Sequence, residues 1–203
     1  MTSAADLASF LDARPPAARA AAWAADAHRG QDREVDGAPF LVHPLEVALL
    51  LHQSGASDEV VAAGILHDVV EKRVATIDDV RGAFGARVAA IVAVLSEDAA
   101  IADYEERKAA LRGAVAAAGD DALAVFAADK LAKARELRVA AAADRMSARE
   151  AACRRAHYVA SLELLERGLP AHPLTVALRF ELTAQDLVPA LAWLSPTPAP
   201  AVA

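Results

Sequence analysis

The chain has 203 residues, of which 56% are hydrophobic but only 4% are aromatic, and its formal net charge is −7. This length suits a single domain with a sizeable core, and the negative balance argues against a broad nucleic-acid-binding surface. The single cysteine, Cys153, excludes an intramolecular disulfide and a cysteine-based zinc site. We interpret Cys153 as a small buried residue.

The composition favours helices over strands. Alanine, the best helix former, supplies much of the apolar content, whereas the aromatic residues typical of strands are few. We therefore expect an all-α domain over residues 1–194, followed by a disordered Pro- and Ala-rich tail over 195–203. The expected helices span residues 3–13, 16–29, 44–54, 58–70, 77–83, 86–95, 105–118, 121–139, 148–167 and 173–192.

Capping and helix-breaking residues set these boundaries. Ser57, Thr76 and Ser147 precede apolar runs and are expected to be N-caps. Gly85 is expected to interrupt the helical segment between residues 77 and 95, and Gly119 to end a helix. The N-terminus does not resemble a signal peptide. No apolar run reaches the ~18 uncharged residues that a membrane span requires, so we expect a cytoplasmic protein without membrane partners.

An adjacent polar pair, His67-Asp68, lies within an otherwise apolar run. Burying such residues without a partner costs free energy, and a metal ion is their natural partner. On the helix expected here, Glu71 lies at i+4 from His67 and at i+3 from Asp68, so all three side chains can point into one cleft. This arrangement would provide two ligands and a carboxylate able to handle a metal-bound water.

Further ligands must come from other helices. His43 precedes Pro44 at a helix start, where its side chain can face a cleft. Asp129 is an acid in the middle of an apolar helical run, and it is equally consistent with a surface carboxylate paired with Lys133 at i+4. The remaining histidines are interpreted as isolated surface or helix-end residues: His28, His52, His157 and His172.

Four blocks of sequence resemble a known family in their order and spacing. They read AHRGQDR (27–33) with GAPFLVHP (37–44), AAGILHDVVE (62–71), LSED (95–98) with ERK (106–108), and ADKL (128–131). Together they resemble the hydrolase domain of the RelA/SpoT alarmone proteins. The layout is most similar to the single-domain small alarmone hydrolases, within the HD phosphohydrolase superfamily. The resemblance implies an HD-domain helical bundle with a metal site between helices.

The resemblance also implies an activity. The family hydrolyses guanosine tetra- or pentaphosphate and releases pyrophosphate from the 3′ position, so the implied partner is a small guanine nucleotide alarmone. His43, His67, Asp68 and Asp129 match the family's metal ligands, usually for Mn²⁺. Glu71 matches the first residue of the family's Glu-Asp pair, which serves the attacking water.

Cations are needed around such an anionic substrate. Arg33 matches a basic residue that the family places against the substrate, and Lys72, Lys130 and Lys133 are further candidates. Each of these also fits a solvated charge on a helix surface, and for Lys130 we favour that interpretation.

Two positions depart from the family pattern. Lys72 occupies the second position of the catalytic Glu-Asp pair, and Lys133 stands where family members usually carry an Asn that lies in the nucleotide pocket. Two unit charges ~5 Å apart, at an effective dielectric constant of ~20, interact with an energy of roughly 3 kcal/mol. A reversed charge beside a divalent cation could therefore weaken metal binding or water activation. We hypothesise that the pocket is re-tuned toward phosphate contacts, with a shifted substrate or reduced turnover.

There are three alternatives to alarmone hydrolysis. The chain could hydrolyse another phosphorylated nucleotide, or it could be a nucleotide-binding regulator with weakened catalysis, which Lys72 favours. A purely structural helical scaffold would leave the four matched ligands unexplained.

Overall fold

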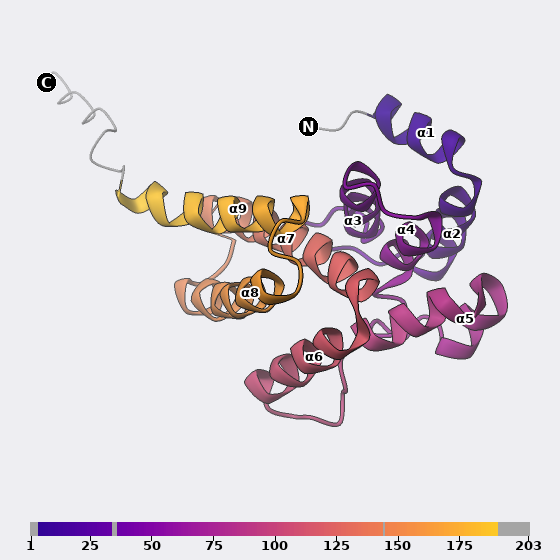
Figure 1. The fold of residues 1–203 in the computed structure, drawn as a ribbon. Helices are drawn as coiled ribbons and strands as arrows, with labels where there is room; N and C mark the ends of the chain where they lie inside the picture. The colour runs from indigo at the N-terminus through magenta and orange to yellow at the C-terminus, as the bar shows by residue number, and fades with distance from the viewer. Residues whose placement is uncertain (1–3, 34–35, 144, 191–203) are drawn as a thin grey trace, which may run out of the picture.

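The computed structural model describes residues 4–33, 36–143 and 145–190 (Figure 1). Within these ranges the chain forms helices and no strand, apart from one isolated bridge between Asp32 and Pro39, and the all-α prediction is confirmed. The expected tail lies outside the described residues, and the boundary at residue 194 stays a prediction. The helices are α1 (Ala4–Ala13), α2 (Pro15–Ala27), α3 (Val42–Gln53), α4 (Asp58–Leu66), α5 (Ile77–Leu95), α6 (Tyr104–Ala118), α7 (Asp120–Ala142), α8 (Ala148–Gly168) and α9 (Pro173–Ala190).

The expected capping residues begin their helices. The side chains of Ser57 and Ser147 accept hydrogen bonds from backbone amides in the first turns of α4 and α8. Thr76 and Asp79 form a reciprocal capping box at the start of α5. Gly85 has a φ of 86° and a ψ of 170° and interrupts α5 internally, so the break expected there is confirmed.

Helix α4 ends earlier than expected, at Leu66 rather than at residue 70. The reason is local: the His67 ring donates a hydrogen bond from Nδ1 to the carbonyl oxygen of Gly64 at 2.7 Å. In a continuing helix the Gly64 carbonyl would accept a hydrogen bond from the backbone amide of Asp68. The His67 side chain therefore competes with the helical hydrogen bond. Residues 67–73 then form turns, and Arg73 takes a left-handed φ of 58°.

Two central helices, α4 and α7, form much of the buried core. Helix α4 is buried continuously over residues 60–66 and packs against α2, α3, α5 and α7. Helix α7 is buried over residues 122–132 and packs against α3, α4, α5, α6, α8 and α9. In Figure 1, α7 lies between α1–α4 on one side and α8 and α9 on the other. A polar side chain in the middle of α7 is therefore inside the molecule.

The close approach of α3 and α4 depends on the absence of a side chain at Gly64. A Cβ there would lie 2.4 Å from Cδ1 of Leu51 and 3.3 Å from Cγ1 of Val47, and both of these residues are fully buried. To accommodate a Cβ, the buried Leu51 side chain would have to shift within a packed core.

Gly64→Ala is expected to destabilise the fold by about 1–3 kcal/mol through overpacking, measured as the free energy of unfolding in urea. The matched control is Gly82→Ala in α5, where a Cβ meets nothing within 4 Å. There we expect a gain of about 0.5–1 kcal/mol from improved helix propensity. Equal effects at the two positions would contradict the packing argument.

None of the helices in the described ranges combines the length and the apolarity that a membrane span would require.

Candidate metal centre

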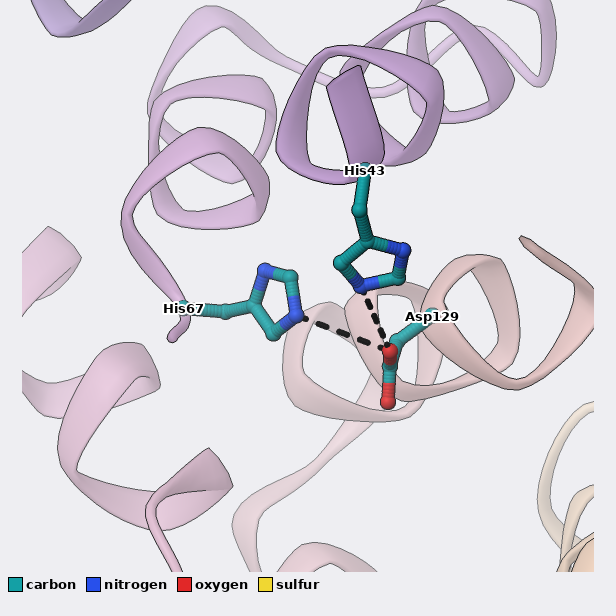
Figure 2. Close-up of side chains that lie close together, drawn as sticks. All are labelled: His43, His67 and Asp129. Carbon is teal, nitrogen blue, oxygen red and sulfur yellow. Dashed lines mark hydrogen bonds and ion pairs between the residues drawn. The ribbon is translucent and has the colours of Figure 1, made fainter. Parts of the chain in front are cut away.

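Three helices bring His43, His67 and Asp129 together in the interior. His43 lies in the first turn of α3, His67 directly follows α4, and Asp129 lies in the middle of α7. Figure 2 shows the two rings converging on the Asp129 carboxylate. The Asp129 Oδ1 atom lies 3.1 Å from Nε2 of His43 and 3.5 Å from Nε2 of His67. One ligand atom from each residue lies within 4.8 Å of the others.

Asp68 completes this cluster. Its carboxylate oxygens lie 3.7 Å from Nε2 of His43 and 3.3 Å from Nε2 of His67. All four side chains are buried, with exposed fractions of 3–4%. The structure therefore brings the four predicted ligands together from segments that lie far apart in the sequence. In the cluster, two imidazole nitrogens lie close to the oxygens of two carboxylates. Such a set of donor atoms suits a divalent transition metal.

The orientation of the His67 ring fits a ligand, because Nε2 faces the carboxylates of the cluster. Because Nδ1 donates to the Gly64 carbonyl, the neutral ring carries a lone pair on Nε2. That Nε2 atom is buried and has no hydrogen-bond partner among the described residues. Burial alone would lower the pKa of His67, but the carboxylates of Asp68 and Asp129 raise the pKa to about 10. The cluster thus attracts positive charge to the position that a metal would take.

Two lysines on α7 contact Asp129 directly. The Lys130 ammonium lies 2.7 Å from Oδ2, and the Lys133 ammonium lies 2.9 Å from Oδ1. Although burial opposes ionisation of Asp129, these ammonium groups hold the pKa of its carboxyl well below the usual value. Burial likewise disfavours charge on Lys133, yet Asp129, Asp68 and Glu71 raise the pKa of its ammonium well above the usual value.

The expected solvated position of Lys130 was wrong. Lys130 is only 3% exposed, and its ammonium lies 4.7 Å from the centroid of the Phe126 ring. Burial lowers the pKa of Lys130, and the Asp129 carboxylate opposes that effect. The surface interpretation of Asp129 was wrong for the same reason, because this part of α7 is covered by its neighbouring helices.

Glu71 and Lys72 lie in the turn segment after α4, so the expected placement of Glu71 on the same helix as the ligands was wrong. Both side chains are exposed, and both line two adjoining cavities. The Lys72 ammonium lies 5.2 Å from the centroid of the Phe40 ring and makes no hydrogen bond or ion pair with the described residues. The positive charge at position 72 is therefore not paired with a carboxylate of the cluster.

The smaller cavity, of about 340 Å³, has His43 and Asp68 in its wall together with Arg33. The Arg33 guanidinium is hydrogen-bonded to Asp36 and lies 3.6 Å from the Glu136 carboxylate. Arg33 thus lies beside the cluster, as expected, but its charge is partly met by two acids.

The larger cavity, of about 570 Å³, is strongly cationic. It shares Glu71, Lys72, Lys133 and Arg154 with the smaller cavity, so the two cavities adjoin at these residues. Helix α8 contributes to this wall, which was not predicted from the sequence. The only signal in the sequence is a group of basic residues near the start of that helix. The cations that line the larger cavity are Lys72, Lys108, Lys130, Lys133, Arg149 and Arg154.

Three further interpretations from the sequence need correction. His28 and His157 are buried rather than superficial, with 4% and 2% exposure. Burial, reinforced by nearby cations, lowers the pKa of His157 to about 2, and Arg112 donates a hydrogen bond to its Nδ1 at 2.8 Å. Cys153 is exposed rather than buried and lines the larger cavity. The burial of His28 depends on contact with Phe40, and that of His157 on the packing of α8 against α6 and α7, which no local pattern reveals.

The sequence is similar to known alarmone hydrolases. It is 39% identical over 92 residues to the Mus musculus guanosine-3′,5′-bis(diphosphate) 3′-pyrophosphohydrolase MESH1, a match that covers 44% of this chain. The match spans 51% of that relative, so the chain aligns with about half of its length.

Solved structures share the fold. A metazoan orthologue of SpoT, described as hydrolysing ppGpp, superposes with a TM-score of 0.72 over 85% of this chain and 97% of its own, at 24% identity. The lmo0812 protein of Listeria monocytogenes EGD-e superposes with a TM-score of 0.62 over 70% of this chain and 97% of its own, at 31% identity. The family model of the HD domain matches residues 20–154, which include all four clustered residues. The chain therefore belongs to the HD domain family.

Proposed function

We propose that the chain is a metal-dependent pyrophosphohydrolase that removes pyrophosphate from the 3′ position of guanosine 3′,5′-bis(diphosphate)-like alarmones. The observation that carries this proposal is the buried cluster of His43, His67, Asp68 and Asp129 beside a cationic cavity. The activity named for the MESH1 relative supports it.

The family and the cluster imply a divalent metal, and we propose Mn²⁺ held by His43, His67, Asp68 and Asp129. When bound, such a cation lowers the pKa of a water and offsets charge that develops at phosphorus. We assign Glu71 to orient the attacking water and accept its proton. Its carboxylate is exposed where the two cavities meet and makes no hydrogen bond with the described residues, so it is free to accept one from water.

The two cavities suit a ligand with two separated anionic groups. The scissile group would lie in the smaller cavity, against His43 and Asp68, with Arg33 beside it. The second group would lie in the larger cavity, where six cations face two acids, Glu71 and Glu150. Lys72 and Lys133 line both cavities and can serve either group. A nucleotide that carries diphosphates at both its 3′ and 5′ positions has this charge distribution.

One observation favours a nucleotide-binding regulator with little turnover as the second candidate. The ammonium of Lys133 lies 2.9 Å from Asp129 Oδ1, the oxygen that faces both histidines. A protein cation at this position opposes a metal cation. The re-tuning of the pocket by Lys72 and Lys133, the cytoplasmic location and the absence of membrane or nucleic-acid partners stay predictions.

The decisive experiment measures pyrophosphate released from the guanosine alarmone with added Mn²⁺. We expect turnover by the wild-type chain and none by Asp68→Ala, whose carboxylate faces both histidines. No turnover under any divalent metal would refute the hydrolase proposal and leave the regulator. Turnover by Asp68→Ala would refute the assignment of the site. A panel of other phosphorylated nucleotides, run in parallel, identifies the preferred substrate.

A further inference from the structure

The Oδ1 atom of Asp129 is surrounded by three nitrogen atoms. His43 Nε2 lies at 3.1 Å, His67 Nε2 at 3.5 Å and Lys133 Nζ at 2.9 Å. A metal held by both histidines needs the electron pairs of this same oxygen, at the short bond lengths of metal coordination. The Lys133 ammonium therefore contacts the same oxygen atom to which a metal would bind.

The contact follows from helix geometry. Lys133 is at i+4 from Asp129 on α7, so the two side chains are neighbours on one face of the helix. Lys130, the other lysine in contact with Asp129, differs from Lys133 in the oxygen that it contacts and in its exposure to solvent. Lys130 binds the other oxygen, Oδ2, and is only 3% exposed, against the ring of Phe126. Lys130 holds the carboxylate in place, whereas the Lys133 side chain is 29% exposed.

The Lys133 ammonium also has open space beside it. It lines both the smaller cavity, beside the cluster, and the larger cationic cavity. The lysine side chain is a flexible four-carbon stem, so its ammonium can leave Asp129 without any backbone movement. Two like charges near one carboxylate oxygen repel each other, so the ammonium and a divalent cation each weaken the binding of the other there.

We propose that Lys133 and the divalent metal compete for Asp129 Oδ1, and that metal binding moves the Lys133 ammonium into the cavities, where it can bind phosphate. This inference rests on the metal centre of the proposed function and assigns Lys133 as a positioning residue that sets the affinity for metal. It also couples the two ligands, because the displaced ammonium becomes available to an anion only after the metal has bound.

The first test measures the dissociation constant for Mn²⁺ by titration calorimetry, without nucleotide. Lys133→Met and Lys133→Asn are expected to bind Mn²⁺ roughly tenfold more tightly than the wild-type chain, because the competing charge is removed. The matched control is Arg149→Met, which removes a cation from the same cavity wall but forms no hydrogen bond or ion pair with the four clustered residues. The control should change the constant by less than about twofold, because more distant charges are screened.

A second test uses the wild-type chain, so it does not depend on the folding of any variant. An amine-reactive reagent is applied with and without Mn²⁺, and modification of each lysine is followed by peptide mass spectrometry. Mn²⁺ is expected to speed the modification of Lys133 several-fold, since its ammonium leaves Asp129. Lys72, which has no ion pair with the described residues, should be unaffected.

Four results would overturn the inference. These are unchanged or weaker Mn²⁺ binding in both Lys133 variants, equal tightening in Arg149→Met, and a rate of Lys133 modification that does not respond to Mn²⁺. The fourth is the absence of Mn²⁺ binding by every chain, which would remove the metal centre as well. The first three leave the hydrolase proposal standing, because neither test involves turnover.

Discussion

Asp129→Asn is expected to abolish pyrophosphate release, to remove Mn²⁺ binding and to destabilise the fold. Asp129 is the carboxylate that both histidines and both lysines contact. The amide lacks the negative charge of the carboxylate and binds a divalent cation much more weakly, so we expect turnover to fall at least about 10³-fold. Loss of the charge also leaves the Lys130 ammonium buried without its partner, which costs about 3–5 kcal/mol when a buried pair is broken. Activity assays, calorimetry and urea unfolding measure the three effects.

The double variant Asp129→Asn/Lys130→Met separates stability from function. It removes both members of the buried pair, and replacement of a pair by apolar groups is far less costly than breaking it. We expect the double variant to recover part of the lost stability, as a non-additive term in a double-mutant cycle, with no recovery of turnover. An Asp129→Asn chain that is as stable as the wild type, or that still binds Mn²⁺, would show that this carboxylate is not at the centre of the cluster.

Glu71→Gln is expected to reduce turnover by about 10²–10⁴-fold while leaving the stability of the chain unchanged. That range is typical for the loss of a general base. The isosteric amide cannot accept the proton of the attacking water. Glu71 is exposed and makes no hydrogen bond with the described residues, so its replacement leaves no buried group unpaired. Steady-state kinetics with saturating Mn²⁺ should show the loss in kcat rather than in KM.

Glu150→Gln is the matched control for this experiment. Glu150 also lines the larger cavity, and its replacement removes the same charge, but its carboxylate pairs with Arg154. We expect its kcat to stay within a few-fold of the wild-type value. Similar losses in the two variants would mean that Glu71 acts only through the charge of the cavity, not as a base.

The candidate residues of the cluster could be recognised in the sequence because they interrupt apolar runs, whereas the resemblance to the alarmone hydrolases implied the full set of four. His67 and Asp68 are adjacent polar residues within an apolar run, and His43 precedes a proline at a helix start. Asp129 was harder, since its i+4 spacing to Lys133 fits a surface pair as well as a buried one. In an alanine-rich helix the periodicity does not separate a buried face from an exposed one. The structure settles its position, because α7 is covered on all sides over that stretch.

Other features depend on contacts that leave no local signal. The end of α4 is set by the hydrogen bond between the His67 ring and the Gly64 carbonyl, which shortens the helix against its apolar pattern. The cationic wall formed by Arg149 and Arg154 needs α8 to fold back beside α7. The sequence shows basic residues there, but it does not show what they face.

The separation between His43 and Asp129 has a consequence for the lifetime of the folded chain. These two side chains meet across 86 positions of sequence, so a cation bound to both would close a long loop as a reversible cross-link. A ligand that binds only the native state, present at 100 times its dissociation constant, stabilises that state by about 2.7 kcal/mol. Starvation for metal would then increase the fraction of unfolded chains exposed to proteases. The amount of this protein in a cell would follow its metal supply.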